Sequence, residues 1–326
     1  MSSPHRIVVH GHGGPDALSY EAFTPGEPGP GEVRVAIEAV GVNYIDTYHR
    51  TGLYPIALPG GLGVEAAGTI EAVGPDVANW SPGDRVALLI ETRGAYATQI
   101  VVRADLLFAL PDSVSAEVAA AALLKGITAW MLVERCGKVA PGQIALVHAA
   151  AGGGGSLLVP WLKHAGAIVI AHAGTPEKAE SARQNGADHA LSVAFDALAG
   201  AVREITNGHG ADVIYDGVGA ASWSASLAAI ARRGLLVTYG NASGPVPPLS
   251  PLELLRAGSI FLTRPSMFHY VDTPESRAEA GRRLFAMLGQ GAINADIGQR
   301  FALADAADAH RALESRATRG STILIP

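Results

Sequence analysis

Two patterns of hydrophobic positions divide the chain. In the first third, short runs rich in β-branched residues alternate with turns rich in Pro and Gly, which is typical of strands in a β-barrel. One such turn, residues 23–31, reads Phe-Thr-Pro-Gly-Glu-Pro-Gly-Pro-Gly. The predicted strands are Arg6–His10, Val33–Ala39, Ala67–Val73, Arg85–Ile90 and Tyr96–Val101.

Beyond Pro111 the pattern changes to strand–helix units of about 25–30 residues, which build parallel sheets. The Ala-rich run Ser115–Leu124 predicts a helix, and the apolar runs after it lack alternation, as expected for strands buried on both faces. The predicted parallel strands are Ile144–His148, Ala167–Ala171, Val213–Tyr215 and Gly234–Tyr239; further elements are helices at Glu275–Leu288 and Ala304–Leu313 and a strand at Thr322–Ile325.

Composition narrows the class of protein. A chain of 326 residues with 48% hydrophobic and 17% charged residues predicts about two globular domains. The net charge of −6, without a run rich in Lys or Arg, argues against nucleic-acid binding. The single Cys136 excludes an intrachain disulfide and a four-cysteine zinc site. The N-terminal residues lack the apolar core of a signal peptide, and no stretch reaches roughly 18 uninterrupted apolar residues, so we expect a cytoplasmic protein.

A glycine-rich turn follows the strand Ile144–His148. Residues 149–155 read Ala-Ala-Ala-Gly-Gly-Gly-Gly and precede an apolar segment. Strand, glycine turn and helix is the order of a dinucleotide site, where backbone N–H groups and the positive end of the helix stabilise a pyrophosphate. Against the G-x-G-x-x-G template, Ala150 replaces the first glycine, and Gly152 and Gly155 fill the other two positions. A flexible loop is the alternative, but the strand context favours a dinucleotide.

The end of the next predicted strand indicates which dinucleotide binds. An NAD site places Asp or Glu there, about 20 residues after the turn. Here residues 171–175 read Ala-His-Ala-Gly-Thr. With no carboxylate at the strand end to repel a 2′-phosphate, and with Gly174, Thr175 and Lys178 able to approach one, the sequence predicts NADPH. The alternative is that Lys178 is an ordinary solvated residue of the following helix.

Pro160 lies inside the helix predicted after the glycine turn. A proline in a helix interior removes a hydrogen bond and clashes with the preceding turn, at a cost of about 3 kcal/mol. We therefore predict a kink or a late start of this helix.

Short segments spread over nearly the whole chain carry a family resemblance. These segments are Asn43–Pro55, Gly61–Gly68, Pro82–Val86, Leu124–Thr128, His148–Gly155, Tyr215–Gly219, Tyr239–Asn241, Thr263–Ser266 and Glu314–Thr318. In this order they resemble the medium-chain dehydrogenase/reductase superfamily and, within it, the zinc-free NADPH:quinone oxidoreductases related to zeta-crystallin. The resemblance implies an α/β fold, with a Rossmann-type doubly wound parallel sheet (125–263) and a GroES-like β-barrel catalytic domain (1–124, completed by 264–326).

The zinc alcohol dehydrogenases of this superfamily take catalytic ligands from a Cys and from a Gly-His-Glu segment. The corresponding places here read Gly-Val-Asn at 41–43 and Gly-Val-Glu at 63–65. The 11 histidines form no spaced ligand cluster, so we expect no metal. Without a Lewis acid, alcohol oxidation loses its means of stabilising an alkoxide, whereas a quinone accepts hydride readily. We therefore expect hydride transfer from NADPH to a quinone.

The resemblance also implies site residues and places the nicotinamide between the two domains. Donors on Asn43, Tyr48 and Lys125 would polarise the quinone oxygens as charge develops, with Tyr54 beside them; alternatively, Tyr48 and Tyr54 are packing residues. The implied catalytic residues are Asn43, Tyr48, Tyr54 and Lys125. The implied cofactor contacts are Tyr44, Ile45, Asp46, Thr47, Tyr48, Lys125, Thr128, Met131, Gly152, Gly153, Gly154, Gly155, Gly174, Thr175, Lys178, Tyr239, Gly240, Asn241, Pro265, Ser266, Met267 and Arg316.

Two positions depart from the family pattern. Where relatives often have a tyrosine near the 2′-phosphate, this chain has Val193, so we expect a weaker preference for NADPH over NADH. Met131 stands where a close relative has an aromatic residue, which changes the cofactor packing expected there.

Alternative functions and partners complete the expectations. An enoyl or 2-alkenal reductase of the same fold would deliver hydride to an activated carbon–carbon double bond, and some relatives are lens structural proteins or bind RNA. The resemblance implies a homodimer formed through the edge of the nucleotide-binding sheet, near Val246–Thr263, whose Pro247, Pro248 and Pro251 interrupt strand formation. We expect a small quinone as substrate, and neither membrane nor nucleic acid as partner.

Overall fold

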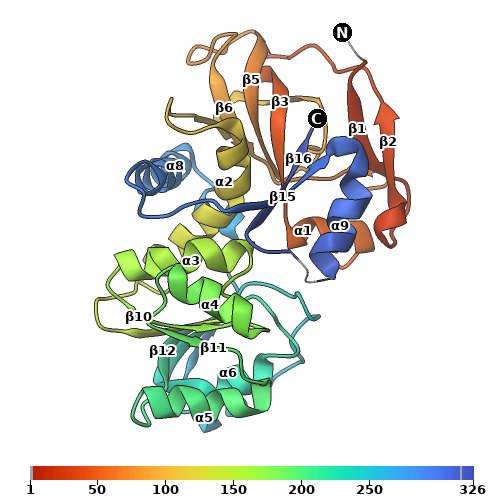
Figure 1. Cartoon of the computed structure of the whole chain (residues 1–326). Helices are drawn as coiled ribbons and strands as arrows, with labels where there is room; N and C mark the ends of the chain where they lie inside the picture. Colours follow the sequence, from red (N-terminus) through yellow and green to blue (C-terminus); the bar gives the residue numbers. More distant parts are fainter. Residues whose placement is uncertain (1–2, 316–317) are drawn as a thin grey trace. The chain divides into compact units, whose positions relative to one another are not determined.

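The computed structural model describes residues 3–315 and 318–326 (Figure 1). The chain divides into two compact units. The barrel unit comprises the chain up to Lys125, Arg277–Gly289 and the chain from Ala295 onward; the sheet unit comprises Gly126–Ser276 and Gln290–Asn294. The sheet unit is thus an insertion into the barrel unit. It runs on to Ser276, so residue 263, where the sequence places the end of the dinucleotide domain, falls inside it.

Strands from both ends of the chain build the barrel unit. Among the described residues, seven strands form one sheet in the order β15-β16-β3-β5-β6-β8, with β7 also pairing with β3, and a smaller sheet has the order β2-β1-β4. The C-terminal β16 pairs antiparallel with β3, so the end of the chain completes this sheet. The strands are β1 (His5–Val9), β2 (Leu18–Ala22), β3 (Glu32–Val42), β4 (Gly60–Gly61), β5 (Glu65–Val73), β6 (Arg85–Leu89), β7 (Gln99–Arg103), β8 (Leu107–Ala109), β15 (Ile297–Ala302) and β16 (Ser321–Ile325).

Alternation along β3 explains the core of the barrel unit. Val33, Val35 and Ile37 are buried, while Arg34 and Ala36 between them are partly exposed. The helices that lie wholly or mainly in this unit are α1 (Tyr44–Thr51), α2 (Ala116–Trp130), α8 (Pro274–Gly289) and α9 (Ala306–Glu314). The π-helical turn Met131–Cys136 follows α2, and 3-10 turns lie at Pro15–Ala17, Ala104–Leu106 and Leu303–Asp305.

One helical stretch of the described chain, Ala116–Cys136, is long and apolar enough to cross a membrane. Its most apolar window is 72% buried inside the structure. Burial of this extent is typical of a core helix, which passes the same test of length and composition.

The sheet unit contains the predicted parallel sheet. Six described strands lie in the order β11-β10-β9-β12-β13-β14, and every pairing between them is parallel. Helices α3 and α4 lie on one face of this sheet and α5 and α6 on the other (Figure 1). The elements are β9 (Ile144–Val147), α3 (Gly153–His164), β10 (Ile168–His172), α4 (Pro176–Gln184), β11 (His189–Leu191), α5 (Phe195–Ile205), β12 (Ala211–Asp216), α6 (Trp223–Ala229), β13 (Ile230–Thr238), α7 (Pro251–Arg256), β14 (Phe261–Thr263) and a 3-10 turn at Met267–Tyr270.

The strand order reverses between β9 and β12. From β9 the chain proceeds outward to β10 and β11, and it then returns to β12 on the other side of β9. In open α/β sheets, ligands bind at the carboxyl ends of the strands at such a switch point. The glycine turn after β9 lies at this point.

Helix α3 accommodates Pro160 with help from a side chain elsewhere. The helix begins at Gly153, so the predicted late start is wrong; the kink stays a prediction. Pro160 has no N–H for the carbonyl of Ser156 four residues earlier. The Asn185 side chain donates a hydrogen bond to that carbonyl oxygen at 2.6 Å and replaces the missing helical bond.

Replacing Asn185 by Ala should leave the Ser156 carbonyl without a donor and lower the free energy of unfolding by about 1–2 kcal/mol. Urea denaturation measures this loss, and Gln184→Ala, which removes an exposed amide next to it, is the matched control. In a Pro160→Ala background the helical N–H is restored, so Asn185→Ala should cost less there. An equal cost in both backgrounds would contradict the replacement of the helical bond by Asn185.

Candidate functional site

The glycine turn joins β9 to α3 at the carboxyl edge of the sheet. Ala149 has a left-handed φ of 50°, which is unusual for a residue other than glycine. A Cβ on Gly155 would lie 2.6 Å from the backbone of Ala149 and Ala150, so only glycine lets the helix pack this closely. A Cβ on Gly154 would meet only the Tyr239 hydroxyl, at 3.9 Å. The turn therefore combines close helix packing with open space over the N-terminus of α3, as a bound pyrophosphate requires.

The residues expected near a 2′-phosphate follow β10. Thr175 caps α4 and accepts a hydrogen bond from the backbone N–H of Lys178, and Gly174 borders open space. Glu177 lies in the first turn of α4. Hydrogen bonds from its own backbone N–H and from the Thr175 hydroxyl lower its pKa. This carboxylate lies beyond the strand end, where the sequence pattern of an NAD site places its Asp or Glu.

Buried polar groups connect the ends of three strands beneath the glycine turn. His148, after β9, contacts the Ser226 hydroxyl at 2.9 Å, and that hydroxyl donates to Asp216 at the end of β12. Asp216 also accepts the backbone N–H groups of residues 218 and 219. His172, at the end of β10, lies 3.4 Å from His148 between their Nδ1 atoms. Burial lowers the pKa of His148 to about 4, so this group stays neutral and holds the strand ends together.

The remaining residues expected to bind the cofactor in the sheet unit fall into two groups. Tyr239, Gly240 and Asn241 follow β13, and Pro265, Ser266 and Met267 follow β14, so both triplets lie at the same edge as the glycine turn. Thr128 and Met131 lie near the end of α2, and Met131 is buried. Arg316 lies outside the described residues.

A buried carboxylate organises the barrel unit's part of the site. Glu65 is fully buried at the start of β5. It accepts hydrogen bonds from the Asn43 side-chain amide at 2.7 Å and from the backbone N–H of Leu124 at 2.6 Å. The Lys125 ammonium lies 3.4 Å from the same oxygen that Asn43 contacts. A Cβ on Gly41 would lie 2.1 Å from that oxygen, so glycine is required there.

Glu65 is a residue of the candidate site that the sequence pattern does not predict. It stands in the Gly-Val-Glu segment, which enters the sequence prediction only as the place of a missing zinc ligand. The structure instead joins it to Asn43 and Lys125, two of the predicted catalytic residues. One amide hydrogen of Asn43 is thereby engaged by Glu65, and the other faces the Gly41 carbonyl at 3.5 Å.

A second buried network begins at Asn43. The Asp46 carboxylate accepts hydrogen bonds from the Asn43 backbone N–H at 2.8 Å and from the Tyr96 hydroxyl at 2.9 Å. His310 contacts the Tyr96 hydroxyl at 3.1 Å, and Arg50 contacts the other ring nitrogen of His310 at 2.9 Å. Asp46 was expected to contact the cofactor, but its carboxylate is directed to these interior groups and has no exposed surface.

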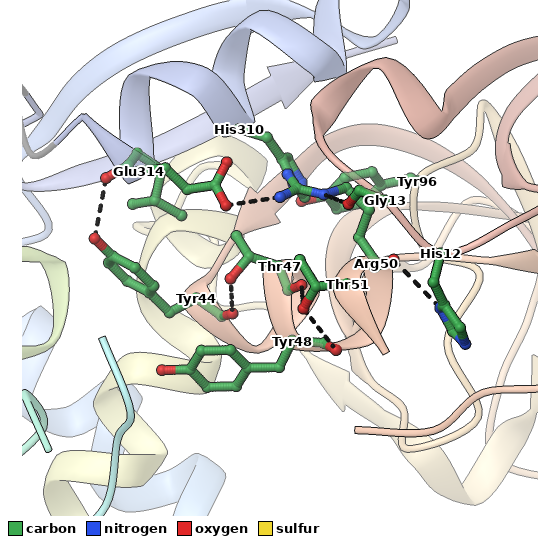
Figure 2. A network of polar contacts seen from close by, with 11 residues as sticks. His12, Gly13, Tyr44, Thr47, Tyr48, Arg50, Thr51, Tyr96, His310 and Glu314 are labelled. Atoms are coloured by element: carbon green, nitrogen blue, oxygen red, sulfur yellow. Dashed lines mark hydrogen bonds and ion pairs between the residues drawn. The ribbon is translucent and has the colours of Figure 1, made fainter. Parts of the chain in front are cut away.

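The protonation states in this network follow from the donors. Figure 2 shows Arg50 reaching both His310 and Glu314. Burial, together with the charge of Arg50, lowers the pKa of His310 to about 3, so its ring is neutral. Since Arg50 can only donate, the ring accepts at Nδ1 and donates from Nε2 to Tyr96. Burial, with a smaller contribution from Glu65, raises the pKa of Asp46 from 3.8 to about 7.

The tyrosines of the site pack against one another. Tyr44 and Tyr48 lie one helical turn apart on α1, with ring centroids 6.4 Å apart, and Tyr48 meets Tyr54 edge to face at 5.2 Å. The Tyr44 hydroxyl donates to the carbonyl of Leu313, which joins α1 to α9. Ile45 and Thr47 lie on the same helix, and the Thr47 hydroxyl bonds the backbone carbonyl of Tyr44. Tyr48 and Tyr54 thus pack against each other, as the packing alternative for these two residues expects.

No group of three or more His, Cys, Asp or Glu side chains within residues 3–315 and 318–326 is arranged to hold a metal ion. The positions that correspond to zinc ligands carry Asn43 and Val64, and Val64 is fully buried. That the protein acts without a metal stays a prediction.

The raised pKa of Asp46 predicts how stability depends on pH. The folded protein binds this proton more tightly than the unfolded chain, so the carboxyl contributes stability at pH 4 that is lost as the pH rises through about 7. Relative to Asp46→Asn, the wild-type free energy of unfolding should fall by about 4 kcal/mol between pH 4 and pH 8. Denaturation across this range measures the difference, with Asp112→Asn as an exposed control. A wild-type curve parallel to that of Asp46→Asn would contradict the assignment.

Comparison with known proteins is consistent with this geometry. The family described as "Alcohol dehydrogenase GroES-like domain" matches residues 29–112, and "Zinc-binding dehydrogenase" matches residues 153–275. A protein of Pseudomonas aeruginosa named quinone oxidoreductase is 45% identical, covering 98% of this chain and 99% of the relative. A 2-haloacrylate reductase of Burkholderia is 40% identical, covering 98% of each chain.

A solved structure extends the comparison. Escherichia coli quinone oxidoreductase complexed with NADPH has a TM-score of 0.96 and 42% identity, and the match covers 99% of this chain and 100% of that chain. The predicted α/β fold, with its Rossmann-type parallel sheet and GroES-like domain, is confirmed. The chain belongs to the quinone oxidoreductase family of the medium-chain dehydrogenase/reductase superfamily.

Proposed function

We propose that this protein is an NADPH:quinone oxidoreductase that transfers hydride without a metal. The observation that carries the proposal is the Asn43–Glu65–Lys125 cluster, in which an amide and an ammonium are held by a buried carboxylate. These groups can stabilise negative charge on a substrate oxygen. A relative named quinone oxidoreductase at 45% identity and another solved with NADPH support the same reaction.

The sheet unit is the proposed dinucleotide-binding domain. The first turn of α3 would bind the pyrophosphate through its backbone N–H groups, because Gly154 leaves this end of the helix open. Gly174, Thr175 and Lys178 would bind the 2′-phosphate at the end of β10. Glu177 lies in the same turn of α4, and its negative charge would weaken discrimination against NADH, as would Val193.

The barrel unit is the proposed catalytic domain. When bound, the reduced nicotinamide supplies the hydride. Addition of hydride to a quinone leaves negative charge on a ring oxygen. The Lys125 ammonium would stabilise this charge, together with the Asn43 amide hydrogen that makes only a long contact, at 3.5 Å, with the Gly41 carbonyl. Glu65 would hold both donors in position, so it is a positioning residue. Tyr48 and Tyr54 would form one wall of the substrate site by their edge-to-face contact.

The edge of the parallel sheet is the proposed dimer interface. Leu252 and Leu255 of α7 and Phe261 of the edge strand β14 are 56%, 61% and 63% exposed. Exposed large apolar side chains on an edge strand and on the helix before it are typical of a surface covered by another chain. We therefore propose that the protein forms a homodimer through this edge. Its proposed location is the cytoplasm.

Gly155 and Gly154 of the turn should respond differently to substitution by Ala. Gly155→Ala places a methyl group against backbone and should lower stability by about 1–3 kcal/mol and raise the KM for NADPH at least about tenfold. Gly154→Ala occupies a variable position of the template and should change stability by less than about 0.5 kcal/mol. Unfolding curves and NADPH titrations measure both effects. An equal loss of stability in the two variants would contradict the close packing assigned to Gly155.

Steady-state kinetics with NADPH should show a higher kcat/KM for 1,4-benzoquinone and naphthoquinones than for 2-alkenals. Glu65→Gln removes the charge that holds Lys125 and should lower kcat/KM for quinones about 10- to 100-fold, because charge-assisted contacts in the transition state are lost. Glu71→Gln, at an exposed position of the same strand, is the control. Efficient turnover of alkenals without turnover of quinones would favour the alkenal reductase alternative.

Light scattering should give the mass of a dimer for the wild type and that of a monomer for Leu255→Glu, because a charge at the centre of an apolar interface is left unpaired. Tyr20→Ser alters an exposed aromatic residue of the barrel unit and should leave the dimer intact. A monomeric wild type at micromolar concentration would rule out the proposed assembly.

A further inference from the structure

A pocket lies on the barrel unit, lined by none of the residues assigned to cofactor or substrate. It has a volume of about 310 Å³ and lies between β1, the segment after β2, the loop after β6 and strand β7. Its apolar lining includes Ile7, Phe23 and Ile100. A volume of this size is at the lower end of the range for small-molecule sites.

The charged side chains of the pocket are all positive. Arg6 and Arg93 line it, and the lining residues, all within the described part of the chain, include no Asp or Glu. The Arg6 guanidinium lies over the Phe23 ring, 5.1 Å from its centroid, which places a cation at an apolar wall. Two guanidinium groups without an acidic group among the lining residues create a positive potential inside the pocket.

The loop that carries Arg93 is strained. Arg93 has a left-handed φ of 68°, and the next residue, Gly94, has a φ of 112°. The Nε atom of Arg93 is buried and has no hydrogen-bond partner within the described residues. Buried polar atoms are nearly always paired, and backbone strain persists where the surrounding structure enforces it. The strained backbone therefore fixes the point at which the Arg93 side chain leaves the loop, at the wall of the pocket.

We propose that this pocket binds a small organic oxyanion with an apolar body, of the carboxylate class. Arg93 and Arg6 would pair with the oxyanion, because guanidinium groups bind carboxylates by charge-assisted hydrogen bonds. Phe23 and Ile100 would contact the apolar body. The dinucleotide and quinone sites proposed above use other residues, so this is a second ligand site.

The charge of Arg93 also acts on helix α1. Burial, and secondarily the charge of Arg93, lowers the pKa of His49 to about 4. The ring of His49 lies 6.1 Å from that of Tyr54, measured between centroids. An anion paired with Arg93 therefore changes the electrostatic environment of His49, and the ring resonances of His49 report its binding.

Isothermal titration of the intact protein with benzoate tests the proposal, in saturating NADPH without an acceptor so that the cofactor site is occupied. Benzoate should bind with one-to-one stoichiometry, and neutral benzamide should bind at least about tenfold more weakly. Arg93→Gln and Arg6→Gln should each weaken benzoate binding at least about tenfold, and Arg93→Lys should recover part of the affinity. Arg103→Gln, at an exposed position of β7, is the matched control and should bind as the wild type does.

Phenyl phosphate and inorganic phosphate distinguish the parts of the ligand. Inorganic phosphate that binds as tightly as benzoate would overturn the requirement for an apolar body, and phenyl phosphate that binds more tightly than benzoate would overturn the carboxylate class. Absence of benzoate binding at millimolar concentration, equal binding of benzamide, or unchanged binding in Arg93→Gln would overturn the site. Quinone reduction should be unchanged in Arg93→Gln. Failure of the proposed enzymatic function and failure of this ligand site can therefore be told apart.

Discussion

The burial of the Glu65 carboxylate is the constraint on which the proposed active site depends. An ionised carboxylate in the interior is strongly destabilising unless donors surround it. Here the donors come from the Asn43 side chain, the backbone of Leu124 and the ammonium of Lys125. Because those donors belong to the cap of α1 and to α2, satisfying one buried charge fixes two elements and the two donors that we assign to the substrate oxygen.

Asn43 is held between two buried carboxylates. Its side-chain amide donates to Glu65, and its backbone N–H donates to Asp46. Asp46 is in turn connected through Tyr96 and His310 to Arg50, which bonds Glu314 at the end of α9. A residue restrained on both its main chain and its side chain loses little entropy on binding a ligand, which favours a preorganised site.

Sequence could predict the features that are local along the chain. The glycine turn and the strand before it are contiguous, so their pattern identified the dinucleotide fold, and the missing zinc ligands were visible as Asn43 and Val64. The C-terminal strand was predicted to return to the barrel, and β16 pairs with β3.

Contacts between distant segments could not be predicted from the pattern. Glu65 meets Lys125 across 60 residues, and Arg50 meets His310 across 260. The compensation of Pro160 by Asn185 depends in the same way on how α3 and α4 pack, which no local motif records. Glu65 stands in the Gly-Val-Glu segment, but its contacts with Asn43 and Lys125 form only in the folded chain.

A double-mutant cycle on Asn43 and Glu65, measured as kcat/KM for 1,4-benzoquinone with NADPH, tests the central claim most directly. If Glu65 acts by holding Asn43 and Lys125, then Asn43→Ala should cost much less in a Glu65→Gln background than in the wild type, because the interaction is already broken. Costs that simply add would show that the two residues act independently and would contradict this account.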